Sequence, residues 1–220
     1  MTNPKIEAVA FDMDGTMFNT EDLYDKVGEI LLQRRGHHFT RDLKLQMMGL
    51  PGNKAFEIMR QHCGLNESVE ELQKETDTIF VGMLEDEIAM MPGLEKILEL
   101  LERLDIPKGV ATSSHRQFAV KSLGYFDLEP RFEFILTSED VENGKPHPDI
   151  YLAAADKFGV APQNMLVLED SKTGSTAGVA AGAYTIAVPT EHSKGMDFSH
   201  VAQVALSLKD DVILRLFENQ

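Results

Sequence analysis

The sequence predicts an α/β protein in which a doubly wound parallel sheet carries an inserted all-helical domain. Short apolar runs without polar alternation suit strands covered on both faces, and these runs alternate with segments of helical spacing. In contrast, residues 20–87 contain no convincing strand. We therefore expect an α/β core from residues 1–19 and 88–220 and a helical domain from residues 20–87.

Five apolar runs are expected to form the strands of the core. They are residues 6–11, 108–111, 132–136, 165–168 and 184–188. Helical spacing separates most of them, as in the leucine and isoleucine repeat that follows Pro92. Further helices are expected near residues 115–123, 148–158 and 172–181.

The inserted segment shows helical patterns instead of strands. Ser68 and Glu71 have the spacing of a capping box, and an apolar stripe continues beyond them. We expect a long helix over residues 68–86.

Composition limits the classes of partner. The 220 residues are 43% hydrophobic, enough for one sizeable core and a smaller second one. With 21 basic and 36 acidic residues the net charge is −15, which disfavours nucleic acid as a partner. Cys63 is the single cysteine, and no apolar stretch approaches the length of a membrane span. We expect a cytoplasmic monomer that does not contact a membrane.

Two carboxylates follow the first apolar run. Asp12 and Asp14 lie two residues apart where the expected strand opens into a turn. Carboxylates so close to each other repel, and a divalent cation between them is the simplest way to relieve the repulsion. A solvated turn is the competing interpretation of this pair by itself.

Polar residues also follow two other expected strands. Thr112, Ser113 and Ser114 follow the second run, and Glu169, Asp170 and Ser171 follow the fourth. Lys145 stands between a glycine and a proline. Ligands of open α/β sheets bind beyond the carboxyl ends of the strands. Carboxylates, hydroxyls and a cation gathered there are what phosphoryl transfer requires.

These residues resemble the four motifs of the haloacid dehalogenase-like hydrolases, in the same order and over essentially the whole chain. The motifs are Asp-Met-Asp-Gly-Thr at residues 12–16, Thr112, Lys145 in Gly-Lys-Pro, and the pair Glu169 and Asp170. The resemblance implies a Rossmann-like core and a cap domain, inserted after the first motif, that selects the substrate. It looks closest to the branch with pseudouridine 5'-phosphatases, sugar phosphate phosphatases and β-phosphoglucomutases.

The resemblance also implies a role for each motif residue. Asp12 would be the nucleophile that forms an aspartyl-phosphate, and Asp14 the general acid and base. Thr112, Ser113 and Lys145 would bind the phosphoryl group. The implied cofactor is Mg²⁺, held by Asp12, by the backbone carbonyl of Asp14, by Asp170 and by Glu169, either directly or through water.

The implied activity is Mg²⁺-dependent hydrolysis of a small phosphorylated metabolite, a sugar phosphate or a nucleoside-like monophosphate. Candidate substrate contacts are Glu21, Tyr24, Gly49, Gly52, Asn53, Lys54, His115 and Arg116. A phosphosugar mutase is the alternative, although Tyr24 and Gly52 stand where mutases have a histidine and an arginine. A noncatalytic phosphate-binding module is a further alternative, but it would have little need for the acid and base Asp14.

Overall fold

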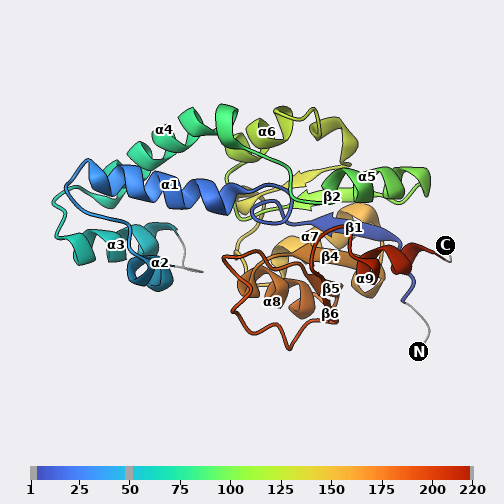
Figure 1. Ribbon diagram of the computed structural model, residues 1–220. Helices are drawn as coiled ribbons and strands as arrows, with labels where there is room; N and C mark the ends of the chain where they lie inside the picture. Colours follow the sequence, from blue (N-terminus) through green and yellow to red (C-terminus); the bar gives the residue numbers. More distant parts are fainter. Residues whose placement is uncertain (1–3, 48–51, 219–220) are drawn as a thin grey trace. The chain divides into compact units, whose positions relative to one another are not determined.

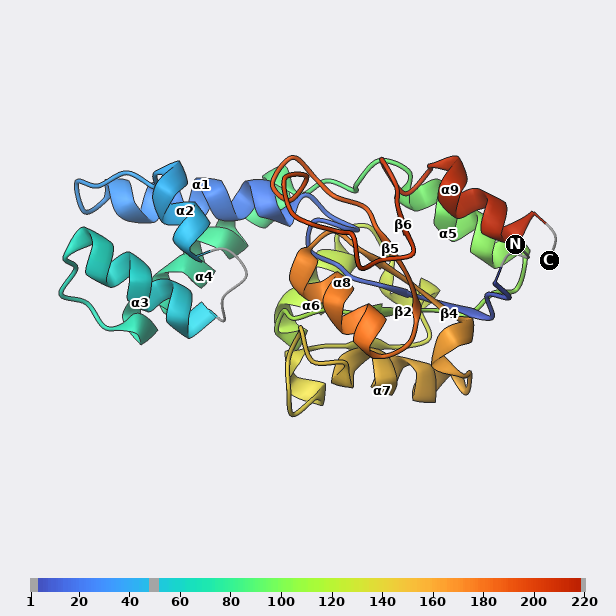
Figure 2. The same ribbon diagram turned by 90° about the horizontal axis from the view of Figure 1, so that it is seen from below.

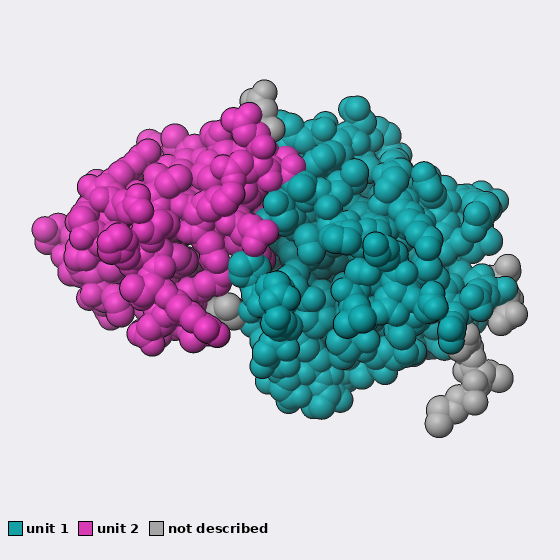
Figure 3. Space-filling model, viewed as in Figure 1, with its two compact units in different colours: residues 1–19, 89–220 teal, residues 20–88 magenta. Residues whose placement is uncertain are grey.

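The computed structural model describes residues 4–47 and 52–218, and the chain forms two compact units. Unit 1 comprises residues 1–19 and 89–220, and unit 2 comprises residues 20–88 (Figure 3). The boundary expected from the sequence at the return to unit 1 lies one residue earlier.

Unit 1 is built on a six-stranded parallel sheet (Figure 1). Its strands are β1 (Ala8–Phe11), β2 (Lys108–Ala111), β3 (Ile135–Leu136), β4 (Met165–Glu169), β5 (Tyr184–Ala187) and β6 (Gln203–Val204). They lie in the order β3-β2-β1-β4-β5-β6, so β1 is central, between β2 and β4. This order confirms the predicted α/β class.

Helices cover both faces of the sheet. All residues of β1, β2 and β4 are buried, which requires covered faces because successive side chains point to opposite sides. The helices of unit 1 are α5 (Leu94–Arg103), α6 (Arg116–Gly124), α7 (Asp149–Phe158), α8 (Lys172–Ala180) and α9 (Asp211–Leu214). Figure 2 shows α5 and α9 on one side of the strands and α7 on the other.

The four short 3₁₀ helices of the described chain all lie in unit 1. They are Glu129–Arg131, Ser138–Asp140, Pro162–Asn164 and Arg215–Phe217. The second of them is capped by Thr137, whose hydroxyl accepts from the amide of Glu139. This capped turn directly follows β3 at the carboxyl edge of the sheet.

Two parts of the sheet differ from the prediction. The run 132–136 forms a strand only at Ile135–Leu136, because this edge strand pairs with β2 alone. Phe132 instead packs its ring edge-on against Phe11, with 6.0 Å between the centroids. Strand β6 was not predicted: it is only two residues long, Gln203 and Val204, and lies at the edge of the sheet with β5 as its one partner. Helix α9 was also missed.

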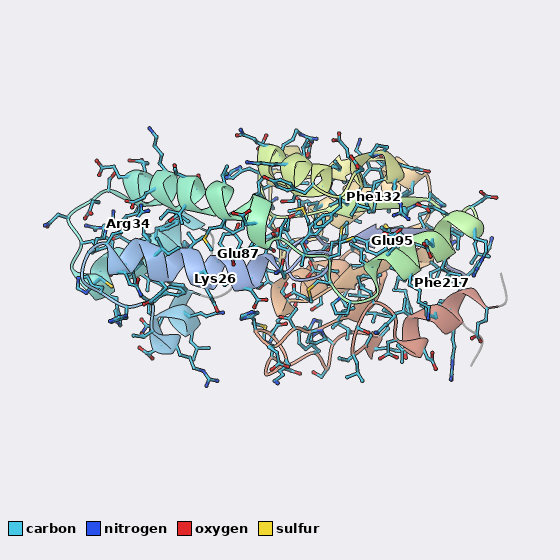
Figure 4. All side chains as sticks on the ribbon, turned by 45° about the horizontal axis from the view of Figure 1, so that its top comes forward. Lys26, Arg34, Glu87, Glu95, Phe132 and Phe217 are labelled. Atoms are coloured by element: carbon cyan, nitrogen blue, oxygen red, sulfur yellow. The ribbon has the colours of Figure 1, made fainter. Side chains whose placement is uncertain are left out.

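Unit 2 contains four described helices, namely α1 (Thr20–Gln33), α2 (Arg41–Met47), α3 (Gly52–Cys63) and α4 (Val69–Glu87). The predicted capping box is present at α4, where the Ser68 hydroxyl accepts from the Glu71 amide and the Glu71 carboxylate accepts from the Ser68 amide. Helix α1 packs along α4, and Lys26 pairs with Glu87 near one end of this contact (Figure 4).

Ion pairs also tie the start of α4 to the end of α1. Arg35, which is largely buried, donates to Glu67 at 2.8 Å and to Glu75 at 2.6 Å. Its guanidinium also donates to the carbonyl of Leu31 at 2.8 Å. Unit 2 thus has a core and polar links of its own. Across residues 4–47 and 52–218, no helix has the length and apolar character that crossing a bilayer requires.

Candidate active site

The carboxyl ends of β1, β2 and β4 meet at one edge of the sheet. Phe11 of β1 is in register with Val110 of β2 and with Leu168 of β4, so the strands end at nearly the same level. The Asp12 amide donates to the carbonyl of Leu168 at 3.0 Å, which fixes the backbone just beyond β1. Asp12 therefore leaves the sheet between the ends of its two neighbours.

Lys145 connects the ends of all three strands. Its Nζ donates to Asp12 Oδ1 at 2.6 Å, to Glu169 Oε1 at 2.7 Å and to the carbonyl of Ala111 at 2.9 Å. These contacts occupy every proton of the ammonium. Since only 4% of the Lys145 side chain is exposed, little water screens its attraction to the two carboxylates.

The buried cluster carries an excess of negative charge. Burial, and then repulsion from Glu169, raises the pKa of Asp12 well above its ordinary value, while Lys145 opposes the shift. Burial alone would lower the pKa of Lys145, but Asp12 and Glu169 raise it well above its ordinary value. Lys145 is therefore held as a cation, and a further cation would help to keep Asp12 ionised.

One carboxylate oxygen of Asp14 accepts hydrogen bonds from two hydroxyl groups. Its Oδ2 accepts from Thr112 Oγ1 at 3.1 Å and from Ser114 Oγ at 2.7 Å. Its Oδ1 is buried and has no hydrogen-bond partner among the described residues. A buried oxygen without a hydrogen bond destabilises the folded protein, because it has lost its contact with water and gained no partner. The same oxygen is available to exchange a proton with a bound reactant.

Gly15 makes the turn after the first strand possible. Its φ is +76°, in the left-handed region that favours glycine. A Cβ at this position would also lie 2.5 Å from Asp170 Oδ2, closer than atoms of a real side chain come. The glycine of the first motif therefore allows Asp170 to approach the turn that carries Asp12 and Asp14.

The acidic residues fit a divalent cation. Asp12, Glu169 and Asp170 each bring a carboxylate oxygen to within 4.8 Å of the other two, and all three are buried. Oxygen donors of this kind suit a hard ion such as Mg²⁺. The donor set, together with the excess negative charge, therefore fits the cofactor that the sequence predicted.

Glu169 differs from the other two acids because its oxygens already accept several hydrogen bonds. Oε1 accepts from Lys145 and from the Tyr151 hydroxyl at 2.9 Å, and Oε2 accepts from the Ser171 hydroxyl at 3.0 Å and the Ser171 amide at 3.3 Å. A direct bond from Glu169 to a metal would compete with these donors. The geometry therefore favours Asp12 and Asp170 as direct ligands, with Glu169 acting on Lys145.

Thr112 is part of the site and does not cap the helix that follows. Its Oγ1 accepts from the Ser114 amide at 3.0 Å and donates to Asp14, whereas α6 begins only at Arg116 with His115 at the N-cap. Thr112 is fully buried, and Ser113 is exposed. The loop after β2 thus places a hydroxyl beside Asp14 and leaves Ser113 at its surface.

The structure pairs His115 and Arg116 with acidic residues of the turn after β3. The guanidinium of Arg116 donates to both oxygens of Asp140, at 2.8 and 2.6 Å, and the Arg116 amide donates to Glu139 at 3.1 Å. His115 Nδ1 lies 3.4 Å from Glu139. These contacts hold the loop after β2 against the turn after β3, and substrate contact by either residue stays a prediction.

The other predicted substrate contacts belong to unit 2. Glu21 and Tyr24 lie on α1, and Gly52, Asn53 and Lys54 begin α3. The Tyr24 ring packs on Phe80, with 4.5 Å between the centroids. Gly49 falls outside the described residues. Their role in binding a substrate stays a prediction.

Two serines noted from the sequence at the strand ends also take part: Ser114 donates to Asp14, and Ser171 donates to Glu169. Tyr151, which donates to Glu169, was not identified from the sequence. Gly174, in the first turn of α8, leaves room for Glu169, since a Cβ there would lie 1.6 Å from Oε1. Nothing in the local sequence distinguishes Tyr151 from a core aromatic.

Comparison with known proteins gives a family match over most of the chain. Residues 9–188 match the family described as haloacid dehalogenase-like hydrolase. A Thermotoga maritima protein named "Phosphorylated carbohydrates phosphatase" is 33% identical over 181 residues, which is 80% of this chain and 82% of that protein. A Drosophila melanogaster protein named "Probable pseudouridine-5'-phosphatase" is 34% identical, covering 94% of this chain and 91% of its own.

Solved structures show the same fold. A Thermotoga maritima crystal structure titled "putative beta-phosphoglucomutase" superposes with a TM-score of 0.77 at 29% identity, covering 91% of this chain and 94% of that one. These similarities confirm the family and the branch that the motifs indicated.

Proposed function

This chain belongs to the haloacid dehalogenase-like hydrolase family and is a phosphoric monoester hydrolase, and we propose that it dephosphorylates a small organic monophosphate with Mg²⁺ and through an aspartyl-phosphate. One observation carries the proposal. Asp12 Oδ1 accepts from the buried Lys145 ammonium at 2.6 Å, while Asp14, two residues away, keeps one buried oxygen without a hydrogen bond among the described residues.

In the proposed first step, a carboxylate oxygen of Asp12 attacks phosphorus. The new bond joins that oxygen to phosphorus, the ester bond between phosphorus and the substrate oxygen breaks, and Asp14 gives its proton to the leaving oxygen. The hydroxyls of Thr112 and Ser114 hold Asp14 by Oδ2, which leaves Oδ1 for the proton. The products of this step are the free alcohol and aspartyl-phosphate at Asp12.

In the second step, water releases the phosphate. Asp14, now ionised, takes a proton from the water, whose oxygen attacks phosphorus. The bond between phosphorus and Asp12 then breaks, which regenerates the Asp12 carboxylate and yields inorganic phosphate. Asp14 ends the cycle protonated, as it began.

Three groups of the chain are proposed to bind the transferring phosphoryl group. They are the Thr112 hydroxyl, the backbone amide of Ser113 and the Lys145 ammonium. Thr112 and Lys145 would each exchange one of their present hydrogen bonds, to Asp14 and to Asp12, Glu169 or the Ala111 carbonyl, for a phosphoryl oxygen. Donors held near the phosphoryl group stabilise the charge that spreads over its oxygens. The burial of Thr112 and Lys145 supports this role, because electrostatic interactions are stronger away from water.

Asp12, Asp170 and the backbone carbonyl of Asp14 would hold Mg²⁺, with Glu169 acting through Lys145 or a bridging water. The cation supplies charge neutralisation between phosphoryl oxygens and carboxylates. We further propose that unit 2 is the cap that selects the substrate, using Glu21, Tyr24, Gly49, Gly52, Asn53 and Lys54, with His115 and Arg116 contributed by unit 1.

A sugar phosphate or a nucleoside-like monophosphate is the proposed substrate class. Support comes from the names of the relatives, which include a phosphatase of phosphorylated carbohydrates and a pseudouridine-5'-phosphatase. The test is inorganic phosphate release from a panel of phosphorylated sugars, polyols and nucleosides, with and without Mg²⁺. We expect Mg²⁺-dependent release from at least one compound, and no release by folded protein from the whole panel would refute the proposal.

The role of Asp12 has its own test. Asp12→Asn should abolish phosphate release while the circular dichroism spectrum stays that of the wild type. A variant that keeps wild-type turnover would contradict the aspartyl-phosphate mechanism. The mutase alternative predicts a different product: with β-glucose 1-phosphate and a bisphosphate primer, glucose 6-phosphate would form faster than free phosphate.

A further inference from the structure

Tyr151 makes a buried polar contact at the back of the site. It lies on α7, is among the largest fully buried side chains and packs in the cluster that contains Ala111 and Leu136. Despite these apolar surroundings its hydroxyl donates to Glu169 Oε1 at 2.9 Å. A phenylalanine would fill the same space, so the hydroxyl has a purpose other than packing.

The ring of Tyr151 also lies beside the site lysine. Lys145 Nζ is 5.0 Å from the ring centroid, within the range of a cation–π contact. Tyr151 therefore touches both members of the ion pair that Lys145 forms with Glu169. Among the hydrogen bonds of the described residues, Tyr151 donates to Glu169 and not to Asp12.

The position of the Glu169 carboxylate determines whether the Lys145 ammonium stays in contact with Asp12. Lys145 lies between two carboxylates, at 2.6 Å from Asp12 and 2.7 Å from Glu169, so a rotation of Glu169 would draw the ammonium away from the nucleophile. A neutral donor can fix Glu169 without adding a second cation that would compete for Asp12. The Tyr151 hydroxyl is such a donor, and it approaches the same oxygen as Lys145.

We propose that Tyr151 is a positioning residue for the reaction: its hydroxyl holds Glu169 in the orientation that keeps the Lys145 ammonium on Asp12. The inference rests on the proposed function, since it gives Lys145 and Asp12 their catalytic roles. Tyr151 acts through Glu169 and does not touch the phosphoryl group. Its loss should therefore lower kcat and leave the affinity for substrate nearly unchanged.

The test removes the hydroxyl alone. Tyr151→Phe should lower kcat per folded molecule about tenfold, as for the loss of a hydrogen bond to a charged group, with KM within about twofold of the wild type. Tyr184→Phe is the matched control, because it removes a tyrosine hydroxyl that takes no part in the site. The Tyr184 hydroxyl accepts from Gln203 at 2.9 Å, between β5 and the edge strand β6. The control should keep the wild-type kcat. Circular dichroism gives the folded fraction for each variant.

A second measurement does not use turnover. Urea unfolding of wild type, Tyr151→Phe, Glu169→Ala and the double variant forms a double-mutant cycle. Removing the hydroxyl should destabilise the wild type more than it destabilises Glu169→Ala, in which no carboxylate remains for Tyr151 to hold. Equal effects in the two backgrounds would show that Tyr151 does not act through Glu169.

The outcomes separate this inference from the proposed function. If the wild type releases no phosphate from any substrate, the proposed function fails, whereas the unfolding cycle still reports the contact. If the wild type is active and Tyr151→Phe keeps its kcat, the positioning role is refuted and the function stands. A lower melting temperature with unchanged kcat per folded molecule would likewise assign Tyr151 a structural role only.

Discussion

Replacing Gly174 by alanine tests how tightly Glu169 is held. Gly174 lies in the first turn of α8, and an added Cβ would come within 1.6 Å of Glu169 Oε1, 2.0 Å of its Cδ and 2.3 Å of Oε2. Carboxylates at the end of a free side chain could move aside. Glu169 cannot do so without breaking its bonds to Lys145, Tyr151 and Ser171, because both of its oxygens accept from these residues.

Two opposing terms determine the size of the effect. Glycine to alanine in a helix interior ordinarily stabilises by about 1 kcal/mol. Displacing Glu169 breaks a buried ion pair, which costs about 3 to 5 kcal/mol. The difference predicts a net loss of about 2 to 4 kcal/mol, or roughly 5 to 15 °C in melting temperature for a chain of this size. We also expect kcat/KM to fall about a hundredfold or more, because Lys145 loses its second anchor.

The assays are thermal unfolding by circular dichroism and phosphate release at saturating Mg²⁺. Gly82→Ala is the matched control, since Gly82 lies within α4 and an added Cβ there would meet nothing within 4 Å. The control should be as stable as the wild type or more so, by up to about 1 kcal/mol. A Gly174→Ala variant that melts and reacts like the wild type would refute the reasoning, because Glu169 would then be free to move.

Three further predictions concern the cation, the acid and base, and the acid stability of unit 2. Removing divalent ions with a chelator should abolish phosphate release, and adding Mg²⁺ should restore it; full activity in excess chelator would contradict the metal site. Ser114→Ala should lower kcat about tenfold, since Asp14 loses one hydroxyl donor, whereas Ser114→Thr should retain most of the activity. His38, Phe39 and Gln33 hold the pKa of Glu29 at about 2, below its ordinary value of 4.5. Its contribution to stability is therefore complete above pH 4.5 and is lost as the pH falls toward 2. Urea unfolding of Glu29→Gln across this window should show a weaker pH dependence than the wild type, and identical slopes would disprove the assignment.

The central sheet could be predicted because its strands are buried on both faces. Strands β1, β2 and β4 are mostly apolar and fully buried, although β2 begins with Lys108 and β4 ends with Glu169. The polar residues at their carboxyl ends mark the edge where the site forms. Edge strands give a weaker signal: β6 has one partner, and Val204 is half exposed. An edge strand buries less surface, so its residues need not be apolar.

The motif residues were found because their sequence neighbours are informative, whereas their supports act across the fold. Tyr151 meets Glu169 only when α7 packs against the sheet, and the sequence separation of 18 residues has no meaning without that packing. Gly174 matters for the space that it leaves empty. Such a role depends on how the turn between β4 and α8 brings Gly174 against the Glu169 side chain, which the sequence pattern does not show.

The Lys145 contact to Asp12 joins positions 133 residues apart, and the Thr112 contact to Asp14 spans 98. Loop closure over such distances is slow, because the entropy of the intervening chain is lost before the contact contributes. The hydrogen bonds within helices such as α1 and α4 join residues only four positions apart, so these helices can begin to form before the long loops close. During refolding, enzyme activity should return only after the last of these long-range contacts has formed. Its recovery should therefore be slower than the recovery of the circular dichroism signal of the helices.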